Sequence, residues 1–497
     1  MTRMFRRIIR HEWRNLAADH TAWLVMALFA LVIGYAFFNG RVWLKHQRQD
    51  IERMLQGEQK GLAELRGRVE ADERKAAAEG KLGEYPRFGP RNPLYVSIPR
   101  DYNYAILPPT PLAPMAVGQS DLYPAYYKVT AGMKESFMTP RQTESPFKLL
   151  GGQFDLAFVI LYLYPLLILA LGFNLVASEK EEGTLAMLLA NRVRLNQIVM
   201  GKVCVRALVI FFSAVVFSVI GLALSGTGLI AKEALMRLLL WVLAVTAYGA
   251  FWFALTIAVN ALGRNAAANA IALAACWLAF AVMIPSAVNL AASAYYPIPS
   301  RVEFVNARRV EEREAMERGS QLLAKFVEDH PEFAPTDASL DTADFGMLRM
   351  ARDEEVSRKL KPVLDRFNAQ IARQGVFVSR LRYLSPALLM QEALYDVAGT
   401  GGARYQHFRA QVDAHYNAWK DFFAPRIFQK SPITLGDFDH FPRFKYQEEL
   451  AGALIKRVVR PTLLLLTAAA MILLFGLRRY GVYPVVGQRK GKCRKGK

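Results

Sequence analysis

Six apolar stretches, each long enough to cross a bilayer, constrain this chain of 497 residues more than any other feature. A spanning helix needs ~20 mostly apolar residues, because lipid offers its backbone no hydrogen-bond partner. The predicted spans are residues 21–39, 153–176, 203–225, 235–260, 266–291 and 461–477. They predict an all-α polytopic membrane protein with six transmembrane helices, and they exclude the several soluble domains that the length alone would allow.

The basic residues predict the side of each connection, since Lys and Arg are concentrated in cytoplasmic loops. With six spans, residues 1–20, 177–202, 261–265 and 478–497 share one side. Their net charges of +3, +1, +1 and +8 supply +13 of the chain's +20. Residues 295–460, in contrast, hold 25 basic and 23 acidic groups. The positive surplus therefore indicates topology, with both termini cytoplasmic, and a nucleic-acid partner is not expected.

Two large regions, residues 40–152 and 292–460, are left on the extracytoplasmic side. The first begins with a heptad-like stripe that predicts a stalk helix, followed by a Pro- and Tyr-rich segment whose prolines exclude regular helix. We expect the tyrosines to pin an irregular loop onto neighbouring helices, with binding of a ligand or partner as the alternative. The second region is predicted to be mainly helical, with helices over residues 301–328, 347–374, 386–397, 404–423 and 440–457.

The two ends of the chain are predicted to lie at the inner face of the membrane. In residues 1–20, apolar side chains recur at helical spacing with arginines between them, which predicts an interfacial helix lying on the bilayer. Residues 478–497 form a strongly basic cytoplasmic tail. The lipid bilayer is therefore an expected partner of the chain.

Signatures of soluble enzymes are missing from the sequence. It contains no Gly-x-x-x-x-Gly-Lys-[Ser/Thr] phosphate loop, no His-Glu-x-x-His and no Gly-x-Ser-x-Gly. His407 and His415 are eight residues apart but lack a third ligand at zinc spacing. We therefore expect no metal site, no bound cofactor and no catalytic residue in this chain.

The connection between the second and third spans, residues 177–202, holds the most informative local pattern. Ser178-x-x-Glu181 has the spacing of a capping box, and acidic residues favour a helix N-terminus. Gly183 and Thr184 then allow the chain to break and restart a helix. An apolar stripe follows, formed by Leu185, Leu188, Leu189 and Val193. This pattern predicts a short helix parallel to the membrane that can dock into a cytoplasmic partner.

The run from Ser178 to Lys202 resembles the signature of ABC-2-type transporter permeases. It reads Ser-Glu-Lys-Glu-x-Gly-Thr-Leu-x-x-Leu-Leu-x-x-x-Val-x-x-x-x-x-x-x-Gly-Lys and follows the second of six spans, as in that family. The resemblance implies a coupling segment that contacts a separate ATP-binding cassette subunit, which binds ATP and Mg. It also implies a dimer with a second copy or a sister permease in a bacterial inner membrane. The coupling residues that it implies are Glu179, Glu181, Gly183 and Thr184, and the apolar Leu185, Leu188 and Leu189 are assigned to the same coupling role.

The resemblance extends beyond the coupling segment. Residues 117–124, 149–160 and 166–171 are similar to a bacterial subgroup with a large extracytoplasmic insertion between the first two spans. The second insertion, residues 292–460, departs from the compact permeases, which argues against a simple path for small drugs or polysaccharides.

Residues of a possible translocation path are predicted on the second and fifth spans, which the resemblance brings near the dimer axis. They are Phe158, Tyr162, Pro165, Asn269, Trp277 and Phe280. Helix packing is the alternative role for each of them, and Pro165 and Pro285 are expected to mark kinks.

Three functions are compatible with these patterns. The first is the permease subunit of an ABC exporter, which itself hydrolyses nothing. The second keeps the ATPase partner but transmits its motion to periplasmic proteins without a substrate path. The third is a membrane-anchored periplasmic scaffold, which has no use for the pattern in residues 177–202.

Overall fold

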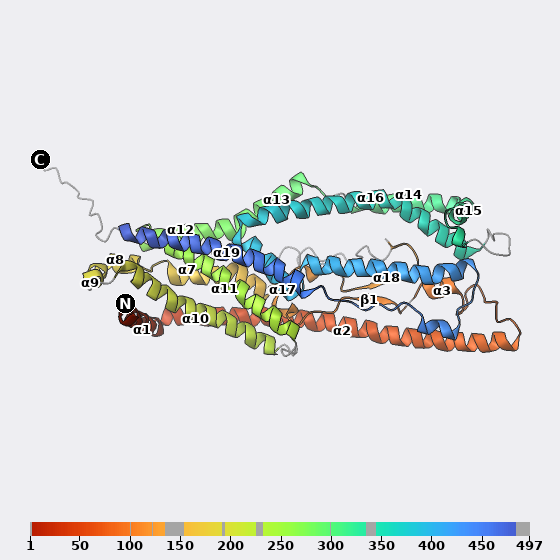
Figure 1. The fold of residues 1–497 in the computed structure, drawn as a ribbon, viewed down its shortest axis with the longest axis horizontal. Coiled ribbons are helices and arrows are strands. Elements are labelled where there is room, and N and C mark those ends of the chain that lie inside the picture. The colour runs from red at the N-terminus through yellow and green to blue at the C-terminus, as the bar shows by residue number, and fades with distance from the viewer. Residues whose placement is uncertain are drawn as a thin grey trace.

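The structure, a computed structural model, describes residues 2–99, 101–121, 123–134, 154–190, 194–224, 232–298, 300–333 and 344–483. The molecule is elongated, with a helical bundle at one end and a helical lobe at the other (Figure 1). Six helical segments among these residues are long and apolar enough to cross a membrane: His20–Ala78, Leu156–Glu181, Leu195–Ile220, Lys232–Asn260, Ala266–Tyr295 and Ala451–Val482. The chain is therefore a predominantly helical, multi-pass membrane protein.

The bundle comprises the apolar parts of these six segments. Its helices are α2 (His20–Ala78), α6 (Leu156–Phe158), α7 (Tyr164–Gly172), α10 (Leu195–Leu224), α11 (Lys232–Asn260), α12 (Ala266–Trp277), α13 (Ile284–Tyr295) and α19 (Ala451–Arg479). α11 packs against α7, α19 and α17 (Pro386–Ala398). Trp241, Tyr248 and Trp252 of α11 are fully buried. A helix that is apolar on all sides belongs inside a bundle, which explains the central place of α11.

α2 continues without a break from the bundle into the lobe, so the predicted first span and the predicted stalk form one helix of 59 residues (Figure 1). At 1.5 Å per residue this helix is about 90 Å long. Gly40 lets another segment approach closely, since a Cβ there would lie 2.0 Å from the carbonyl oxygen of Pro114. The helix ends at Ala78, and Gly80 follows with a positive φ of 70°.

The lobe comprises the described parts of residues 41–134, 301–381 and 402–450. Its elements are α3 (Pro93–Ser97), β1 (Tyr104–Ile106), β2 (Tyr126–Lys128), α14 (Arg301–Glu317), α15 (Gly319–Asp329), α16 (Phe345–Leu381) and α18 (Gly402–Phe428). β1 and β2 pair antiparallel, which adds a two-stranded sheet to the predicted helical class. The lobe core is rich in aromatic side chains, including Phe408, Trp419, Phe423 and Phe428, all fully buried.

The Pro- and Tyr-rich segment is held against α18 by its tyrosines. The hydroxyl groups of Tyr127 and Tyr405 form a hydrogen bond. Tyr123 stacks on Tyr405 with ring centroids 4.1 Å apart. These contacts favour the structural role over the ligand-binding alternative for both residues. Residues 135–153, which include part of the run similar to the permease subgroup, lie outside the described residues.

Two predicted helices of the second region differ from the observed ones. The helix expected over residues 301–328 is divided into α14 and α15 at Arg318. The helix expected over 440–457 is wrong in its first half, because α19 begins only at Ala451. In the extended stretch before it, the backbone N–H and carbonyl of Gln447 bond to the side chain of Gln411 at 2.9 and 2.7 Å. α18 thus supplies the partners that a helix would otherwise provide.

Short turns connect these elements. The 3₁₀ turns lie at Ala113–Met115, Gly118–Asp121, Pro331–Phe333, Arg382–Leu384, Leu435–Asp439 and Tyr480–Val482.

Candidate functional site

The segment after the second span forms two short helices at the end of the bundle that lies away from the lobe (Figure 1). These are α8 (Ala177–Glu181) and α9 (Thr184–Ala190). Gly183 separates them with a φ of 76°, a left-handed conformation that favours glycine. The predicted break and restart at Gly183 and Thr184 is therefore present. α1 (Thr2–Ala18) and the last turn of α19 lie at the same end.

α9 presents part of its apolar stripe to the outside. Leu185 is 1% exposed and anchors the helix, whereas Leu188 is 37% and Met187 73% exposed. Leu189 is half-buried. Beside them, Glu181, Gly183 and Thr184 are also exposed. Val193, the last predicted member of the stripe, lies outside the described residues. The result is a small apolar surface bordered by carboxylates, which suits a protein partner better than water.

α8 connects this surface to the third span. The carboxylate of Glu179 forms an ion pair with Lys202 of α10 at 2.7 Å, and Lys202 also donates to the carbonyl of Leu175 at 3.0 Å. Thr184 Oγ1 donates to the carbonyl of Glu179 at 3.2 Å, which joins α9 to the same contact.

α8 also contacts the fifth and sixth spans. Lys180 donates to the carbonyl of Gly263 at 2.9 Å and lies 5.3 Å from the ring centroid of Tyr483. Glu181 accepts the backbone N–H of Ala266 at 2.8 Å, at the N-terminus of α12, where a negative charge is favoured. Three spans therefore meet the segment that carries α9.

The predicted capping box does not form. Ser178 Oγ donates to Glu182 Oε1 at 3.0 Å, and no side chain caps the start of α8 at Val176. The reason is that α8 begins at Ala177, one residue before Ser178, while Glu181 is used by α12. The two acidic residues implied as partner contacts are thus engaged within the chain.

Two spans contain a turn of π-helix just before a proline. One is Val159–Leu163, ahead of Pro165, and the other is Leu278–Met283, ahead of Pro285. Proline lacks an N–H and its ring displaces the carbonyl of the preceding turn, so nearby carbonyl groups lose their helical donor. The predicted irregularities at these prolines therefore take the form of π turns.

Side chains from other helices bond to carbonyl groups in these turns. The hydroxyl of Tyr248 donates to the carbonyl of Leu161 at 2.8 Å. Ser385 Oγ donates to the carbonyl of Phe280 at 2.5 Å. Such replacement bonds are what allows broken helices inside a bilayer. Sequence reasoning missed both donors, although the two prolines indicated where they were needed.

The structure brings two predicted path residues into direct contact. Trp277 Nε1 donates to the carbonyl of Tyr162 at 3.0 Å, which joins the fifth span to the second. The rings of Tyr162 and Phe158 lie 4.9 Å apart, and Phe280 is half-buried. These contacts fit the packing alternative, and a path role for the residues is a proposal.

Asn269 and Pro165, the other predicted path residues, are buried. Asn269 donates to Asn260 Oδ1 at 3.3 Å and to the carbonyl of Phe173 at 3.4 Å. Asn260 in turn donates to the carbonyl of Gly172 at 3.0 Å. Asparagine pairs of this kind join helices in a bundle, here the second, fourth and fifth spans.

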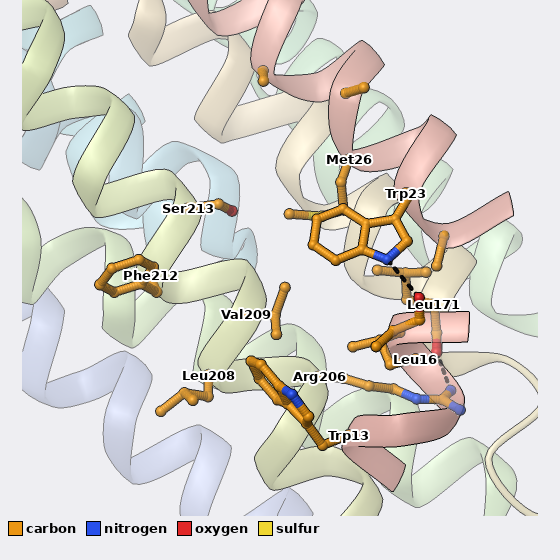
Figure 2. A pocket seen from close by; sticks show the side chains of 14 residues that line it. Trp13, Leu16, Trp23, Met26, Leu171, Arg206, Leu208, Val209, Phe212 and Ser213 are labelled. Atoms are coloured by element: carbon orange, nitrogen blue, oxygen red, sulfur yellow. Dashed lines mark hydrogen bonds between the residues drawn. The ribbon is translucent and has the colours of Figure 1, made fainter. Parts of the chain in front are cut away.

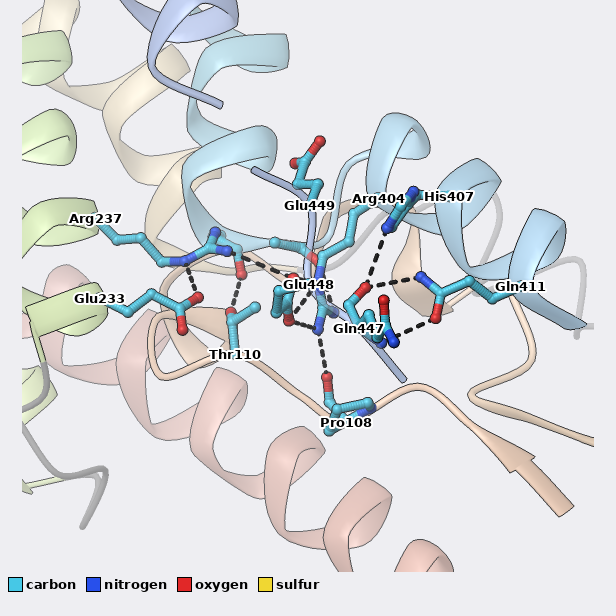
Figure 3. A network of polar contacts seen from close by, with 12 residues as sticks. Pro108, Thr110, Glu233, Arg237, Arg404, His407, Gln411, Gln447, Glu448 and Glu449 are labelled. Carbon is cyan, nitrogen blue, oxygen red and sulfur yellow. Dashed lines mark hydrogen bonds and ion pairs between the residues drawn. The ribbon is translucent and has the colours of Figure 1, made fainter. Parts of the chain in front are cut away.

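At the opposite end of the bundle, charged side chains are buried between the spans and the lobe (Figure 3). Arg237 of α11 is 3% exposed, bonds to Glu233 at 2.8 Å and donates to the carbonyl of Val397 at 3.0 Å. Arg404 of α18 pairs with Glu448 and donates to the carbonyl of Pro108 at 2.8 Å. We call this set of contacts the junction.

The junction extends to α19 through a third arginine, Arg457, that pairs with carboxylates. Arg457 binds Asp396 at 3.1 Å and also pairs with Glu449. Burial raises the pKa of Asp396 to about 6, against the opposing effect of Arg457. Arg237 inside a predicted span was the one sequence signal of the junction, because an ionisable residue there needs a partner.

The two histidines that share the spacing of eight residues have different surroundings. Nε2 of His415 donates to Asn103 Oδ1 at 2.7 Å, and burial lowers its pKa to about 4. His407 Nε2 bonds to the carbonyl of Gln447 at 3.1 Å. Over the described ranges, no three His, Cys, Asp or Glu side chains are grouped to hold a metal ion.

Comparison with known proteins gives one match. No curated protein and no solved structure matches the chain. Residues 301–447 match the family model described as "Domain of unknown function (DUF3526)", which spans the chain from α14 to the extended stretch after α18.

Proposed function

We propose that this chain is the membrane-spanning permease subunit of an ABC exporter, driven by a separate ATP-binding subunit. The observation that carries the proposal is the combination of exposed apolar side chains on α9 with contacts between α8 and the spans. α9 exposes Met187 and Leu188, while α8 is bound to the third, fifth and sixth spans. If a bound partner displaces α9, the contacts of α8 can transmit this displacement to the bundle. The resemblance of residues 178–202 to ABC-2-type permeases gives the partner's class.

In this proposal, the partner binds ATP and Mg and closes around them at the inner face. The closure moves α9, and the contacts of Lys180 and Glu181 carry the motion to the start of α12. The chain acts as a dimer with a second copy or a sister permease. The π turns of the second and fifth spans are the places where these helices can change shape with little loss of backbone bonds.

The docking surface is best tested at its exposed apolar residues. Glu179 and Glu181 are poor positions for such a test, because their charge reversal would also break contacts with Lys202 and Ala266. We expect Met187→Asp combined with Leu188→Asp to abolish co-purification of the ATP-binding subunit. The purified variant should therefore show no MgATP hydrolysis.

The matched control changes two exposed apolar residues of the lobe, Leu82→Asp with Phe88→Asp. We expect this variant to retain both the partner and its hydrolysis. Retention of the partner by the Met187 and Leu188 variant would contradict the docking surface.

A second function, transmission of ATP-driven motion to periplasmic proteins, is favoured by one observation. α2 is a single helix that joins the bundle to the far end of the lobe. Gly57 of this helix has open space around a Cβ, so Gly57→Pro weakens the rod while Gly57→Ala preserves it. If transmission is the function, the Pro variant loses its periplasmic effect but keeps MgATP hydrolysis. If transport is the function, efflux persists in both variants.

A further inference from the structure

An apolar groove of about 510 Å³ lies between α1, α2 and α10 (Figure 2). Trp13 and Leu16 of α1 form one wall, Trp23 and Met26 of α2 a second, and Phe212 of α10 stands on the third. The groove belongs neither to the α8–α9 surface nor to the junction. Its size is within the range of small-molecule sites in proteins.

The groove is held open by fixed contacts on both sides of α1. At the turn into α2, Trp23 Nε1 donates to the carbonyl of Ala17 at 3.1 Å. On the other side, Arg206 pairs with the buried Glu12 at 2.9 Å and also donates to the carbonyl of Leu171. α1 therefore cannot close onto the groove without breaking an ion pair.

The rim of the groove carries exposed apolar side chains on two candidate spans. Leu208 and Phe212 of α10 are 62% and 69% exposed, and Trp23 of α2 is 56% exposed. These residues lie on two segments that are long and apolar enough to span the membrane. In a bilayer, hydrocarbon chains rather than water would therefore lie next to this rim.

α1 supplies positive charge beside the groove. Arg6, Arg10, Trp13 and Ala17 recur at spacings of four, three and four residues, which places them on one face of the helix. Trp13 and Ala17 line the groove, and Arg6 and Arg10 continue the same face beyond it with exposed side chains. Arg7 and Arg14 are also exposed but lie on a different face.

We propose that this groove binds one acyl chain of an anionic phospholipid, whose headgroup lies against Arg6 and Arg10. The apolar lining suits the chain, and the arginines on the same face of α1 suit the phosphate. An indole at the level of the headgroup is the usual place for tryptophan in a bilayer, as Trp13 would have here. The bound lipid would fix α1 against the bundle. Its binding does not depend on which substrate is exported.

The acyl-chain part of the proposal is tested by filling the groove. Ala27→Trp adds an indole inside it, and Ala470→Trp adds the same indole on the exposed side of α19 as the control. The full chain is purified with phosphatidylglycerol, and bound lipids are counted by native mass spectrometry. We expect wild type and control to retain one more lipid per chain than Ala27→Trp.

Two results would overturn this assignment. Equal lipid counts in the three proteins would mean that no lipid occupies the groove. Conversion of dimers to monomers by Ala27→Trp, with the lipid count unchanged, would mean that a second copy of the chain occupies it.

The headgroup part is tested by surface variants that leave the core intact. We expect Arg6→Gln with Arg10→Gln to lower the preference for phosphatidylglycerol over phosphatidylcholine roughly fivefold per arginine at low salt. Arg7→Gln with Arg14→Gln removes the same charge from the other face and should lower it less. Equal losses in the two variants would indicate diffuse attraction to the membrane surface and contradict the assigned headgroup position.

Discussion

The junction and the α8–α9 surface, at opposite ends of the bundle, treat charged groups in opposite ways. At the junction, Arg237 and Arg404 are almost fully buried, and their donors bond to carboxylates and backbone carbonyls from distant parts of the chain. At the α8–α9 end, the carboxylates of Glu181 and Glu182 are exposed beside the apolar Met187. The difference fits the proposal in which the junction stays together and the α8–α9 end meets a partner.

The difference between the two places arises from the free-energy cost of removing a charge from water. A buried arginine must keep its partners, because an unpaired charge there costs several kcal/mol, so the junction behaves as a fixed connection between spans and lobe. Exposed charges around α9 contribute little to the stability of the fold, so they do not hold this end of the bundle together. A rigid attachment at the junction and the proposed reversible contact at α9 would together suit a device that passes motion along its length.

The largest expected effect is at the junction. Arg404→Ala removes the closest partner of Glu448, which keeps only the 4.0 Å contact with Arg237, and should lower the free energy of unfolding by about 3–5 kcal/mol. The control is Arg74→Ala, which removes an exposed ion pair with Glu70 and should cost no more than about 1 kcal/mol. Thermal unfolding of the purified proteins measures both. Similar losses for the two variants would erase the distinction between the ends.

Acid should destabilise the lobe through His415. Its pKa is lowered from the ordinary 6.5 to about 4 by burial, so its neutral form is favoured in the folded state. The stability contribution is present above pH 6.5 and is lost as the pH falls through 4, by roughly 3 kcal/mol in all. His415→Gln keeps a donor for Asn103 and should remove this part of the pH dependence. An unchanged profile of unfolding against pH in that variant would refute the prediction.

The π turns should show an intermediate effect. Tyr248→Phe removes the donor to the carbonyl of Leu161 and should lower stability by about 0.6–1.7 kcal/mol. Tyr35→Phe removes a hydroxyl from a side chain that is 58% exposed and serves as the control, with a change within about 0.5 kcal/mol. Unfolding in mild detergent measures both. If Tyr248→Phe behaves like the control, the carbonyl of Leu161 does not need its donor.

The smallest effect on stability is expected at α9. Met187→Asp with Leu188→Asp changes only exposed side chains, so the unfolding free energy should change by no more than about 0.5 kcal/mol. Loss of the ATP-binding subunit without loss of stability would separate docking from folding. A strongly destabilised variant would instead place these residues in the packed part of the bundle.

The spans could be predicted from the sequence because apolar length is a local property. The division of residues 177–190 into two short helices at Gly183 could also be predicted, since glycine and the apolar stripe lie within one short segment. The capping box at Ser178 and the helix over residues 440–450 could not be settled locally. In both places, a group far away in the chain, Ala266 or Gln411, took the hydrogen bond that the local pattern had assigned.

The junction and the π-turn donors were beyond local reasoning for the same reason. Arg404 meets Pro108, nearly three hundred residues earlier, and Ser385 meets Phe280. No periodicity connects such pairs. The sequence did show an arginine inside a span, which requires hydrogen-bond partners, and two intramembrane prolines, which leave carbonyl groups without donors. It did not show which residues supply those partners.

Photo-crosslinking at α9 tests the central claim most directly. A photoreactive amino acid is placed at Met187, or at Leu82 in the lobe as the control, and the chain is irradiated in its own membranes. We expect a covalent adduct between the Met187 position and an ATP-binding cassette subunit, and no such adduct from Leu82. The yield of the Met187 adduct should change when MgATP is added. An adduct from Leu82, or labelling of the Met187 position by a membrane-impermeant reagent added from outside, would contradict the proposed coupling site.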